Sequence, residues 1–523
     1  MTEPSRAVRV AYGIALILLG IVCFAFTYDA LLPVGLALCA AMAVAVARRG
    51  RAALPAVKRD KTESVMLALA VVLLAVLAFL WPDAAMLALA FVGGGALVVL
   101  GMARLRRAFS AKPFVIRAQK GGRLRAGAFL LVALLLHAAS ASALLNVPRP
   151  DSFYTWDNEM PAIPGVQLRA EPIEAVIPGE ASAWRMLYTT TLDEANTVVT
   201  GSAVVFLPPA DAVNNACGVI AWAHGTTGIA IHAAPSVAYG IEKLALSIPG
   251  FEAAMQAGYA IVAPDYAGMG TPVGASYLIG QTEARSVLDA VRAACALSGT
   301  EVLRQRADGV YAFPQLSADT VIWGHSQGGH AALWSAALAP EYAPELRVLG
   351  VAAAAPATDL PALLMKSQEH FVGKALGAYA LFAYEQAYAD VQTADYIRLP
   401  LWPVLNAVSR RSVEEPGILV SVLTSMAIRG PIYSRDPLTG AYGARLMENL
   451  PTRPVAASLF IAQGADDPLI TRAIQDAFVD SLRENGQRLD YTVYNNADHM
   501  TVLDEETGFP SDLLRFTKEA FDE

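Results

Sequence analysis

The stretch VIWGHSQGGH, residues 321–330, joins an apolar, strand-like run to a Gly-x-Ser-x-Gly turn and the start of a helix. A serine raised on a strained strand-to-helix turn needs residues with almost no side chain two positions before and after it, and Gly324 and Gly328 meet that need. The helix expected from residue 329 to about 338 points its N-terminal amides at the serine, where an oxyanion would form. The stretch therefore predicts a nucleophile elbow with Ser326 as the nucleophile, and a motif this short needs partners elsewhere in the chain.

Strand-like and helix-like runs alternate in the C-terminal part of the chain. The β-rich runs are residues 197–207, 218–223, 259–265, 319–323, 348–355, 456–462 and 490–494, and the helical candidates are 281–297, 328–338, 471–485 and 510–521. Such alternation is typical of a mostly parallel, doubly wound sheet covered on both faces, with catalytic residues at the carboxyl ends of strands. Together with the elbow, it predicts an α/β-hydrolase fold over residues 173–523.

Two further segments flank or interrupt this predicted domain. Residues 148–172 are Pro-rich and aperiodic, which favours a linker. Residues 361–454 hold helix-like stretches and many apolar side chains, and an insertion at this point predicts a helical cap over the site. The cap aromatics either bind acyl chains or form the core of the cap, and both interpretations stay open; they are Phe371, Tyr379, Phe382, Tyr384, Tyr388 and Trp402.

The nucleophile needs a general base and an acid. Chain order in this fold is serine, acid, histidine, so only His370 and His499 qualify as the base. His499 lies in a polar loop just after a predicted strand, whereas His370 lies in the predicted cap, where a surface role is expected. The run 459–470, LFIAQGADDPLI, supplies a strand, a glycine turn and two aspartates. Asp467 is the expected acid, with Asp466 as the alternative, and a plain helix-capping role is open for either.

An oxyanion hole needs two backbone N–H groups. The residue after the nucleophile, Gln327, supplies one, and the other comes from a loop after an earlier strand. The run 220–228, IAWAHGTTG, is a strand that leads into such a loop. Gly225 would let the backbone approach the substrate, so Thr226 is the expected second donor, the alternative being an ordinary glycine turn.

The N-terminal part, residues 1–147, is unusually apolar. Five apolar runs of about 18 to 20 residues occur there, at about 8–27, 30–47, 64–81, 84–103 and 126–145. At 1.5 Å per residue, each is long enough as a helix to cross a hydrocarbon core of about 30 Å. The sequence therefore predicts an all-α region of about five membrane spans, and hence a multi-pass membrane protein.

Basic residues in the connections set the expected orientation. Residues 48–61 and 104–125 are rich in Lys and Arg, whereas the short turns near Asp29 and Asp83 carry none. By the positive-inside rule, the N-terminus and the two basic loops are cytoplasmic. The turns near Asp29 and Asp83, and everything after about Ala143, are then expected on the extracytoplasmic side of the cell (inner) membrane. Because Ala143 ends a small-residue tail, the fifth run also resembles a signal peptide whose cleavage there would release the domain.

The two parts of the chain carry opposite charge. Residues 1–145 hold 16 Lys and Arg against 5 Asp and Glu, and the remainder holds 23 against 42. The acidic C-terminal part argues against nucleic acid as a partner. The four preceding runs carry no mid-membrane charge that would mark an ion path, so anchoring without transport is favoured.

Cysteine and histidine spacings predict neither a metal site nor a cofactor. Cys23 and Cys39 lie in predicted spans, and Cys217 and Cys295 lie in the part expected outside the cytoplasm, where oxidation is permitted. Pairing of the last two remains open, since sequence does not give the distance between their Cα atoms.

Three runs together resemble the bacterial and fungal secretory lipase family. They are WAHGTTG at 222–228, PDYAGMG at 264–270 and GHSQGGH at 324–330, with supporting similarity at 164–165, 188–190 and 353–360. The resemblance covers roughly residues 160–515 and implies hydrolysis of acylglycerols and other carboxylic esters without a cofactor. The five-run N-terminal region is not part of the usual secreted form.

The expected function is that of a membrane-anchored serine ester hydrolase acting on apolar acyl esters. Ser326 would attack the ester carbonyl, His499 would take its proton and Asp467 would orient the histidine. Two alternatives stay open: an acyltransferase that uses the same three residues, and a non-catalytic lipid-binding receptor built on the same fold.

Overall fold

The computed structural model describes the C-terminal part of the chain almost completely. It covers residues 6–25, scattered residues between 62 and 138, and 145–523 apart from 193–195, 213–215, 298–303, 307–308, 312–313 and 400. Helix α1 (Arg6–Ala25) is the longest described element of the N-terminal part.

The prediction of about five membrane spans is not supported by the structure. Over the described residues, none of the helices is long and apolar enough to cross a membrane. Of the five predicted spans, the one at 8–27 coincides with α1. The other four, at 30–47, 64–81, 84–103 and 126–145, lie wholly or largely outside the described residues.

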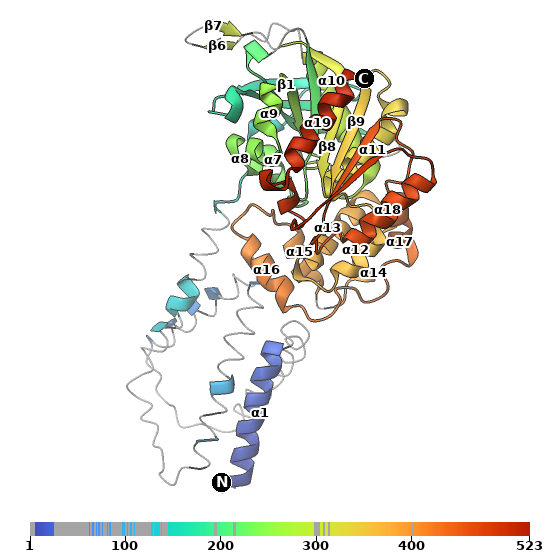
Figure 1. Ribbon diagram of the computed structural model, residues 1–523. Helices are drawn as coiled ribbons and strands as arrows, with labels where there is room; N and C mark the ends of the chain where they lie inside the picture. The colour runs from blue at the N-terminus through green and yellow to red at the C-terminus, as the bar shows by residue number, and fades with distance from the viewer. Residues whose placement is uncertain are drawn as a thin grey trace.

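One large sheet forms the centre of the described fold (Figure 1). Its strand order is β1-β2-β3-β5-β4-β8-β9-β10-β11. The six strands from β5 to β11 are parallel to one another, and β1, β2 and β3 extend the sheet with antiparallel pairing. The strands are β1 (Gln167–Ile173), β2 (Ser182–Thr191), β3 (Val198–Leu207), β4 (Cys217–Ala223), β5 (Ala260–Pro264), β8 (Leu316–His325), β9 (Arg347–Ala354), β10 (Ser458–Gly464) and β11 (Asp490–Tyr494). A separate hairpin pairs β6 (Arg304–Arg306) with β7 (Gly309–Tyr311).

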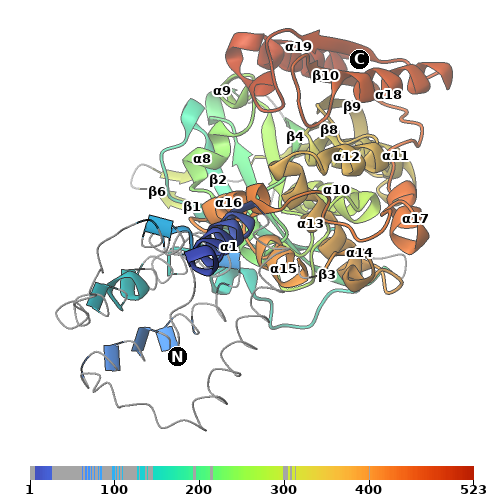
Figure 2. The same cartoon turned by 90° about the horizontal axis from the view of Figure 1, so that it is seen from below.

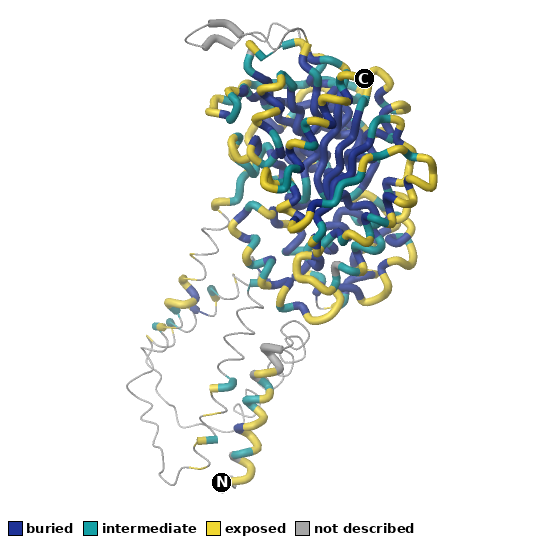
Figure 3. The backbone as a smooth tube through the Cα atoms, in the orientation of Figure 1, coloured by how far each residue is buried: buried dark blue, intermediate teal, exposed yellow. Residues whose placement is uncertain are grey.

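Helices cover both faces of this sheet, as the alternating pattern predicts (Figures 1 and 2). Side chains of β8 alternate between the two covering layers, with Ile322 in one and Val321 and Trp323 in the other. The first layer contains α10 (Gly280–Leu297), α11 (Gln327–Tyr342) and α18 (Arg472–Glu484). The second contains α8 (Ile241–Leu246), α9 (Phe251–Gln256) and α19 (Phe509–Asp522), and the short α7 (Pro235–Ala238) precedes α8. The central strands are buried over most of their length, and β8 and β9 are fully buried at the carboxyl ends that lead to the site (Figure 3).

A helical cap, formed by the segment between β9 and β10, lies beyond one end of the sheet (Figure 1). Its helices are α12 (Leu360–Ser367), α13 (Phe371–Ala387), α14 (Thr393–Tyr396), α15 (Trp402–Ser409), α16 (Ile418–Ala427) and α17 (Gly440–Glu448). The cap has its own apolar core, in which Tyr379, Phe382 and Tyr384 are buried and against which Tyr388 and Trp402 pack. Phe371 is 40% exposed, so it does not belong to that core.

Two strands at the antiparallel end of the sheet, β1 and β2, are not predicted from the sequence. β1 begins inside the segment predicted as a linker, because its position at the edge of the sheet leaves Arg169 and Glu171 half-buried and the segment therefore lacks apolar alternation. β2 is buried on both faces, with Met186, Leu187 and Tyr188 in succession, so it shows no period of two either.

Candidate active site

The turn between β8 and α11 holds Ser326 in a strained backbone conformation. Its φ is 57° and its ψ is −115°, a region that residues with a side chain seldom adopt. A Cβ on Gly324 would lie 2.0 Å from the carbonyl oxygen of Gly328, and one on Gly328 would lie 1.8 Å from that of Ala223. The two glycines are therefore required by the backbone itself, as the motif predicts.

The structure brings Ser326, His499 and Asp467 together. His499 Nε2 lies 2.9 Å from Ser326 Oγ, and its Nδ1 lies 2.7 Å from Asp467 Oδ2. The three residues come from the ends of β8, β11 and β10 or from the loops that follow, so parallel pairing of these strands places them at one edge of the sheet. This arrangement can pass a proton from a serine hydroxyl to an imidazole that a carboxylate orients.

Asp467 rather than Asp466 reaches the histidine. Asp467 is 4% exposed, and its Oδ1 accepts hydrogen bonds from the backbone N–H groups of Leu469 and Ile470 at 2.8 and 2.9 Å. Gln463 Nε2 adds a bond to Oδ2 at 3.2 Å. Together these three hydrogen bonds hold the Asp467 carboxylate in one orientation, whereas Asp466 is exposed to solvent.

Both expected oxyanion donors lie near Ser326: Gln327 is the next residue, and Thr226 lines the same cavity as Ser326. Gln327 opens α11, where the first N–H groups of a helix have no intrahelical acceptor. Gly225 packs close to the elbow, since a Cβ there would lie 3.1 Å from His325 Nδ1 and 3.9 Å from Ser326 Cβ. The next residue, Thr226, is fixed by its Oγ1, which lies 3.0 Å from the hydroxyl of Tyr277.

A second histidine supports the loop that carries His499. His325 Nε2 lies 2.8 Å from the carbonyl oxygen of His499. Burial, together with the nearby His499, lowers the pKa of His325 to about 3, so the ring is neutral and can donate its Nε2–H to that carbonyl. His224, two residues before Thr226, is buried as well, and burial lowers the pKa of His224 to about 4.

Behind the elbow lies a buried polar network that the sequence pattern did not reveal. Glu283 on α10 accepts from Gln327 Nε2 at 2.7 Å and from the N–H of Leu278 at 2.8 Å. Its second oxygen lies 2.8 Å from His330 Nδ1, and His330 Nε2 lies 2.7 Å from the carbonyl oxygen of Asn449. The two nitrogens of the His330 ring thus link Glu283 to the backbone of Asn449.

This network joins the helix that follows the nucleophile to the end of the cap. Asn449 Oδ1 accepts from the N–H of Gly280, and its carbonyl oxygen also accepts from Trp334 Nε1. Glu283 does not stand out in the sequence, because α10 also carries Arg285, Asp289 and Arg292. A charged residue buried in this way needs paired partners that only the fold reveals.

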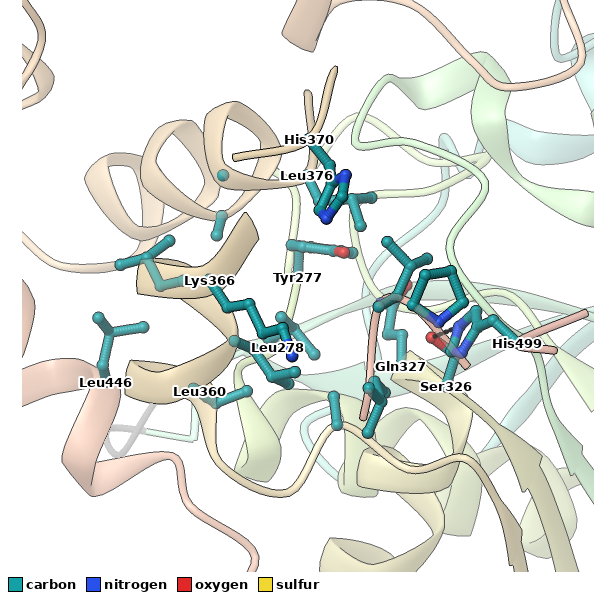
Figure 4. Close-up of a pocket in the computed structure, with 18 residues that line it drawn as sticks. Tyr277, Leu278, Ser326, Gln327, Leu360, Lys366, His370, Leu376, Leu446 and His499 are labelled. Carbon is teal, nitrogen blue, oxygen red and sulfur yellow. Dashed lines mark hydrogen bonds between the residues drawn. The ribbon is translucent and has the colours of Figure 1, made fainter. Parts of the chain in front are cut away.

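Two cavities meet at Ser326 and His499, and both residues line each of them. The smaller, of about 80 Å³, runs under α12 and is walled by Leu360, Leu364, Leu376 and Leu446 (Figure 4). The larger, of about 440 Å³, contains Thr226 and His224, and its apolar wall comes largely from the cap: Phe371, Val372, Tyr379, Val413, Ile418 and Val422. His370, expected at the surface, is exposed at the rim of the smaller cavity.

Neither cysteine of the C-terminal part takes part in the site. Cys217 and Cys295 are both free thiols, and burial raises the pKa of each to about 11. Among the residues that the structure describes, no group of three or more His, Cys, Asp or Glu could hold a metal ion.

Comparisons with known proteins point to lipases. A family model described as Secretory lipase matches residues 240–398. A probable inactive lipase from Mycobacterium tuberculosis is 26% identical over 371 residues, which cover 66% of this chain and 76% of that protein. A secreted triacylglycerol lipase from Malassezia globosa is 30% identical over 257 residues, or 45% of this chain and 51% of the relative. The chain thus spans about half the length of the fungal relative.

A solved structure shows the same fold. Candida antarctica lipase A superposes with a TM-score of 0.55 at 19% identity, over 72% of this chain and 86% of the other. The fold is therefore that of the α/β-hydrolases, as the sequence predicts, and the relatives support a hydrolase of the lipase or esterase type.

Protonation of His325 should weaken the fold in mild acid. Because its pKa falls from 6.5 to about 3 on folding, its stabilising contribution is present above pH 6.5 and is lost as the pH falls toward 3. Between pH 7.5 and 5.5 this loss is about 1.4 kcal/mol. Between pH 7.5 and 5.5 the thermal midpoint of His325→Gln should fall by about 2 °C less than that of the wild type. The exposed control His370→Gln should follow the wild type, and an equal fall in all three proteins would contradict the assignment.

Proposed function

We propose that the protein is a serine ester hydrolase of the lipase and esterase type that acts through Ser326, His499 and Asp467. The observation that carries the proposal is the unbroken pair of contacts from Ser326 Oγ to His499 and from His499 to Asp467, at 2.9 and 2.7 Å. These contacts lie where two largely apolar cavities meet.

In the first half of the reaction, Ser326 Oγ attacks the ester carbonyl while its proton passes to His499 Nε2. The positive imidazolium is stabilised by Asp467, whose carboxylate is already held by two backbone N–H groups and needs no rearrangement. The N–H groups of Gln327 and Thr226 would bind the oxyanion of the tetrahedral intermediate. His499 then protonates the leaving alcohol.

In the second half, water hydrolyses the acyl-enzyme. His499 takes a proton from the water, the hydroxide attacks the acyl carbonyl, and the proton returns to Ser326 as the carboxylic acid leaves. Neither half requires a cofactor.

The cavities favour an apolar acyl group. Burial of apolar surface contributes about 25 cal/mol per Å², so each methylene that enters the larger cavity adds to binding. We assign the acyl chain to the larger cavity, whose cap wall is built from side chains such as Phe371, Ile418 and Val422, and the alcohol part of the ester to the smaller one.

Catalysis is favoured over a purely lipid-binding role. One relative is named a probable inactive lipase. In this chain the serine, histidine and aspartate are all present, and each is within hydrogen-bond distance of the next.

We also place the hydrolase outside the cytoplasm. The basic residues at 48–61 and 104–125, the acidic C-terminal part and the match to a family described as Secretory lipase support this location. A membrane-impermeant fluorophosphonate should label the protein in intact cells, and labelling that appears only after lysis would refute the location.

Replacing the nucleophile should abolish turnover. Ser326→Ala should lower kcat for a short p-nitrophenyl ester by about 10⁴ to 10⁶, because no other group can form the acyl-enzyme. Ser335→Ala, which removes a buried hydroxyl elsewhere on α11, serves as the matched control and should stay within roughly threefold of the wild type. Turnover of the Ser326→Ala protein at the wild-type rate would exclude the proposed nucleophile.

The two neighbouring aspartates should differ sharply. Asp467→Asn should lower kcat by roughly 10² to 10⁴, since an amide cannot stabilise the imidazolium, whereas the exposed Asp466→Asn should change it little. Steady-state kinetics of both variants on the same ester provide the measurement. The reverse ranking would move the acid to Asp466.

A further inference from the structure

Two described residues of the N-terminal part of the chain, Trp81 and Asp83, contact the cap. The Asp83 carboxylate receives both arms of the Arg411 guanidinium, with Nη1 to Oδ2 at 2.5 Å and Nη2 to Oδ1 at 2.9 Å. Asp83 is completely buried and Arg411 is 7% exposed. Trp81, itself 8% exposed, stacks on the guanidinium, whose Cζ lies 5.0 Å from the ring centroid. A two-pronged, buried pair of this kind fixes geometry as well as charge.

The same pair holds α16. Arg411 Nη1 donates to Ser421 Oγ at 3.1 Å, and Thr424 Oγ1 donates to Asp83 Oδ2 at 3.4 Å. Ser421 lines the larger cavity, as do Ile418 and Val422 on the same helix. Asp83 and Arg411 therefore fix the helix that supplies one wall of the proposed acyl site.

The backbone around Arg411 reaches the catalytic side of that cavity. The carbonyl oxygen of Arg411 accepts from the hydroxyl of Tyr379, a cavity residue, at 3.0 Å. Two residues later, the N–H of Val413 donates to the carbonyl oxygen of Thr227 at 2.8 Å, in the loop that carries Thr226. A Cβ on Gly228 would lie 2.9 Å from the Arg411 oxygen, so loop and cap segment are in close contact.

Charge balance explains why Asp83 matters for the cavity. Without the Asp83 carboxylate, the buried Arg411 guanidinium would lose the group that now receives both of its arms, which is strongly unfavourable. Arg411 would then turn toward water and release Ser421, and α16 would lose its fixed position. The triad would remain, because Ser326, His499 and Asp467 make none of these contacts.

We propose that Trp81 and Asp83 are positioning residues for the acyl site, through which the N-terminal part of the chain sets the shape of the larger cavity and hence the preference for long acyl chains. The proposal rests on the proposed esterase function.

The test compares a long and a short ester with the full chain in detergent. For Asp83→Asn, KM for p-nitrophenyl laurate should rise about tenfold, whereas kcat and KM for p-nitrophenyl acetate should stay within about twofold. Arg411→Met should raise KM for p-nitrophenyl laurate by a similar factor. In the double variant KM for laurate should be no higher than in either single variant, because removing both partners leaves no unpaired buried charge. Asp319→Asn, which breaks the exposed pair with Arg347, is the matched control.

Three results would overturn the proposal. They are an unchanged KM for laurate, an equal loss on both esters, and additive effects in the double variant. If Asp83→Asn fails to fold, Thr424→Val removes only the weakest bond to the carboxylate, and it should raise KM for laurate about twofold to threefold. An unchanged value in that variant would count against the proposal equally.

A binding measurement separates this proposal from the proposed function. A fluorescent lauric acid analogue should bind Ser326→Ala protein, and adding Asp83→Asn should weaken its Kd about tenfold. If the wild type neither turns over esters nor reacts with a fluorophosphonate, the esterase proposal fails while this binding difference can still be measured. If the wild type turns over esters but Asp83→Asn leaves the Kd of the lauric acid analogue unchanged, the positioning role is refuted and the esterase proposal stands.

Discussion

The site depends on the close approach of three backbones around Ser326. The carbonyl oxygen of Ala223 at the end of β4 occupies the position that a side chain on Gly328 would need. The N–H of Ser326 donates to the carbonyl oxygen of Ala354 on β9 at 2.9 Å, so the turn is held from the strands on both sides of β8. A tight strand-to-helix turn can hold a strained residue only where its surroundings over-determine it, and here neighbouring strands do so.

The groups that we propose as catalytic are oriented before any substrate arrives. His325, next to the nucleophile, fixes the backbone of His499, while two N–H groups fix Asp467. Gln327 is tied by its side chain to Glu283, so the residue expected to stabilise the oxyanion is held from behind as well. Groups fixed in this way need little reorganisation when charge develops during the reaction, and such preorganisation is a major part of enzymatic rate enhancement.

Local pattern and chain order predicted the strands of the large sheet from β3 onward, which follow from apolar runs. Glycine spacing and chain order also pointed to Ser326, Asp467 and His499, which the structure places within hydrogen-bond distance of one another, while their catalytic role stays a proposal. The strands β1 and β2 were not predicted, because β1 is polar at the sheet edge and β2, beside it, is buried on both faces. Contacts between distant segments could not be foreseen, since nothing in a sequence shows that Glu283 lies beside His330 or that Asp83 meets Arg411.

The bonds of Asn449 fasten one end of the cap. This residue ends the cap, and it is bonded to the start of α10 through Gly280 and to α11 through His330 and Trp334. The segment that precedes α16 is joined to the body as well, since the N–H of Val413 donates to the carbonyl oxygen of Thr227 and His232 Nε2 lies 2.6 Å from Glu415 Oε2. The cap is thus bonded to the body of the protein at two separate places, and a substrate that needs a wider entrance would have to break one of these two sets of bonds.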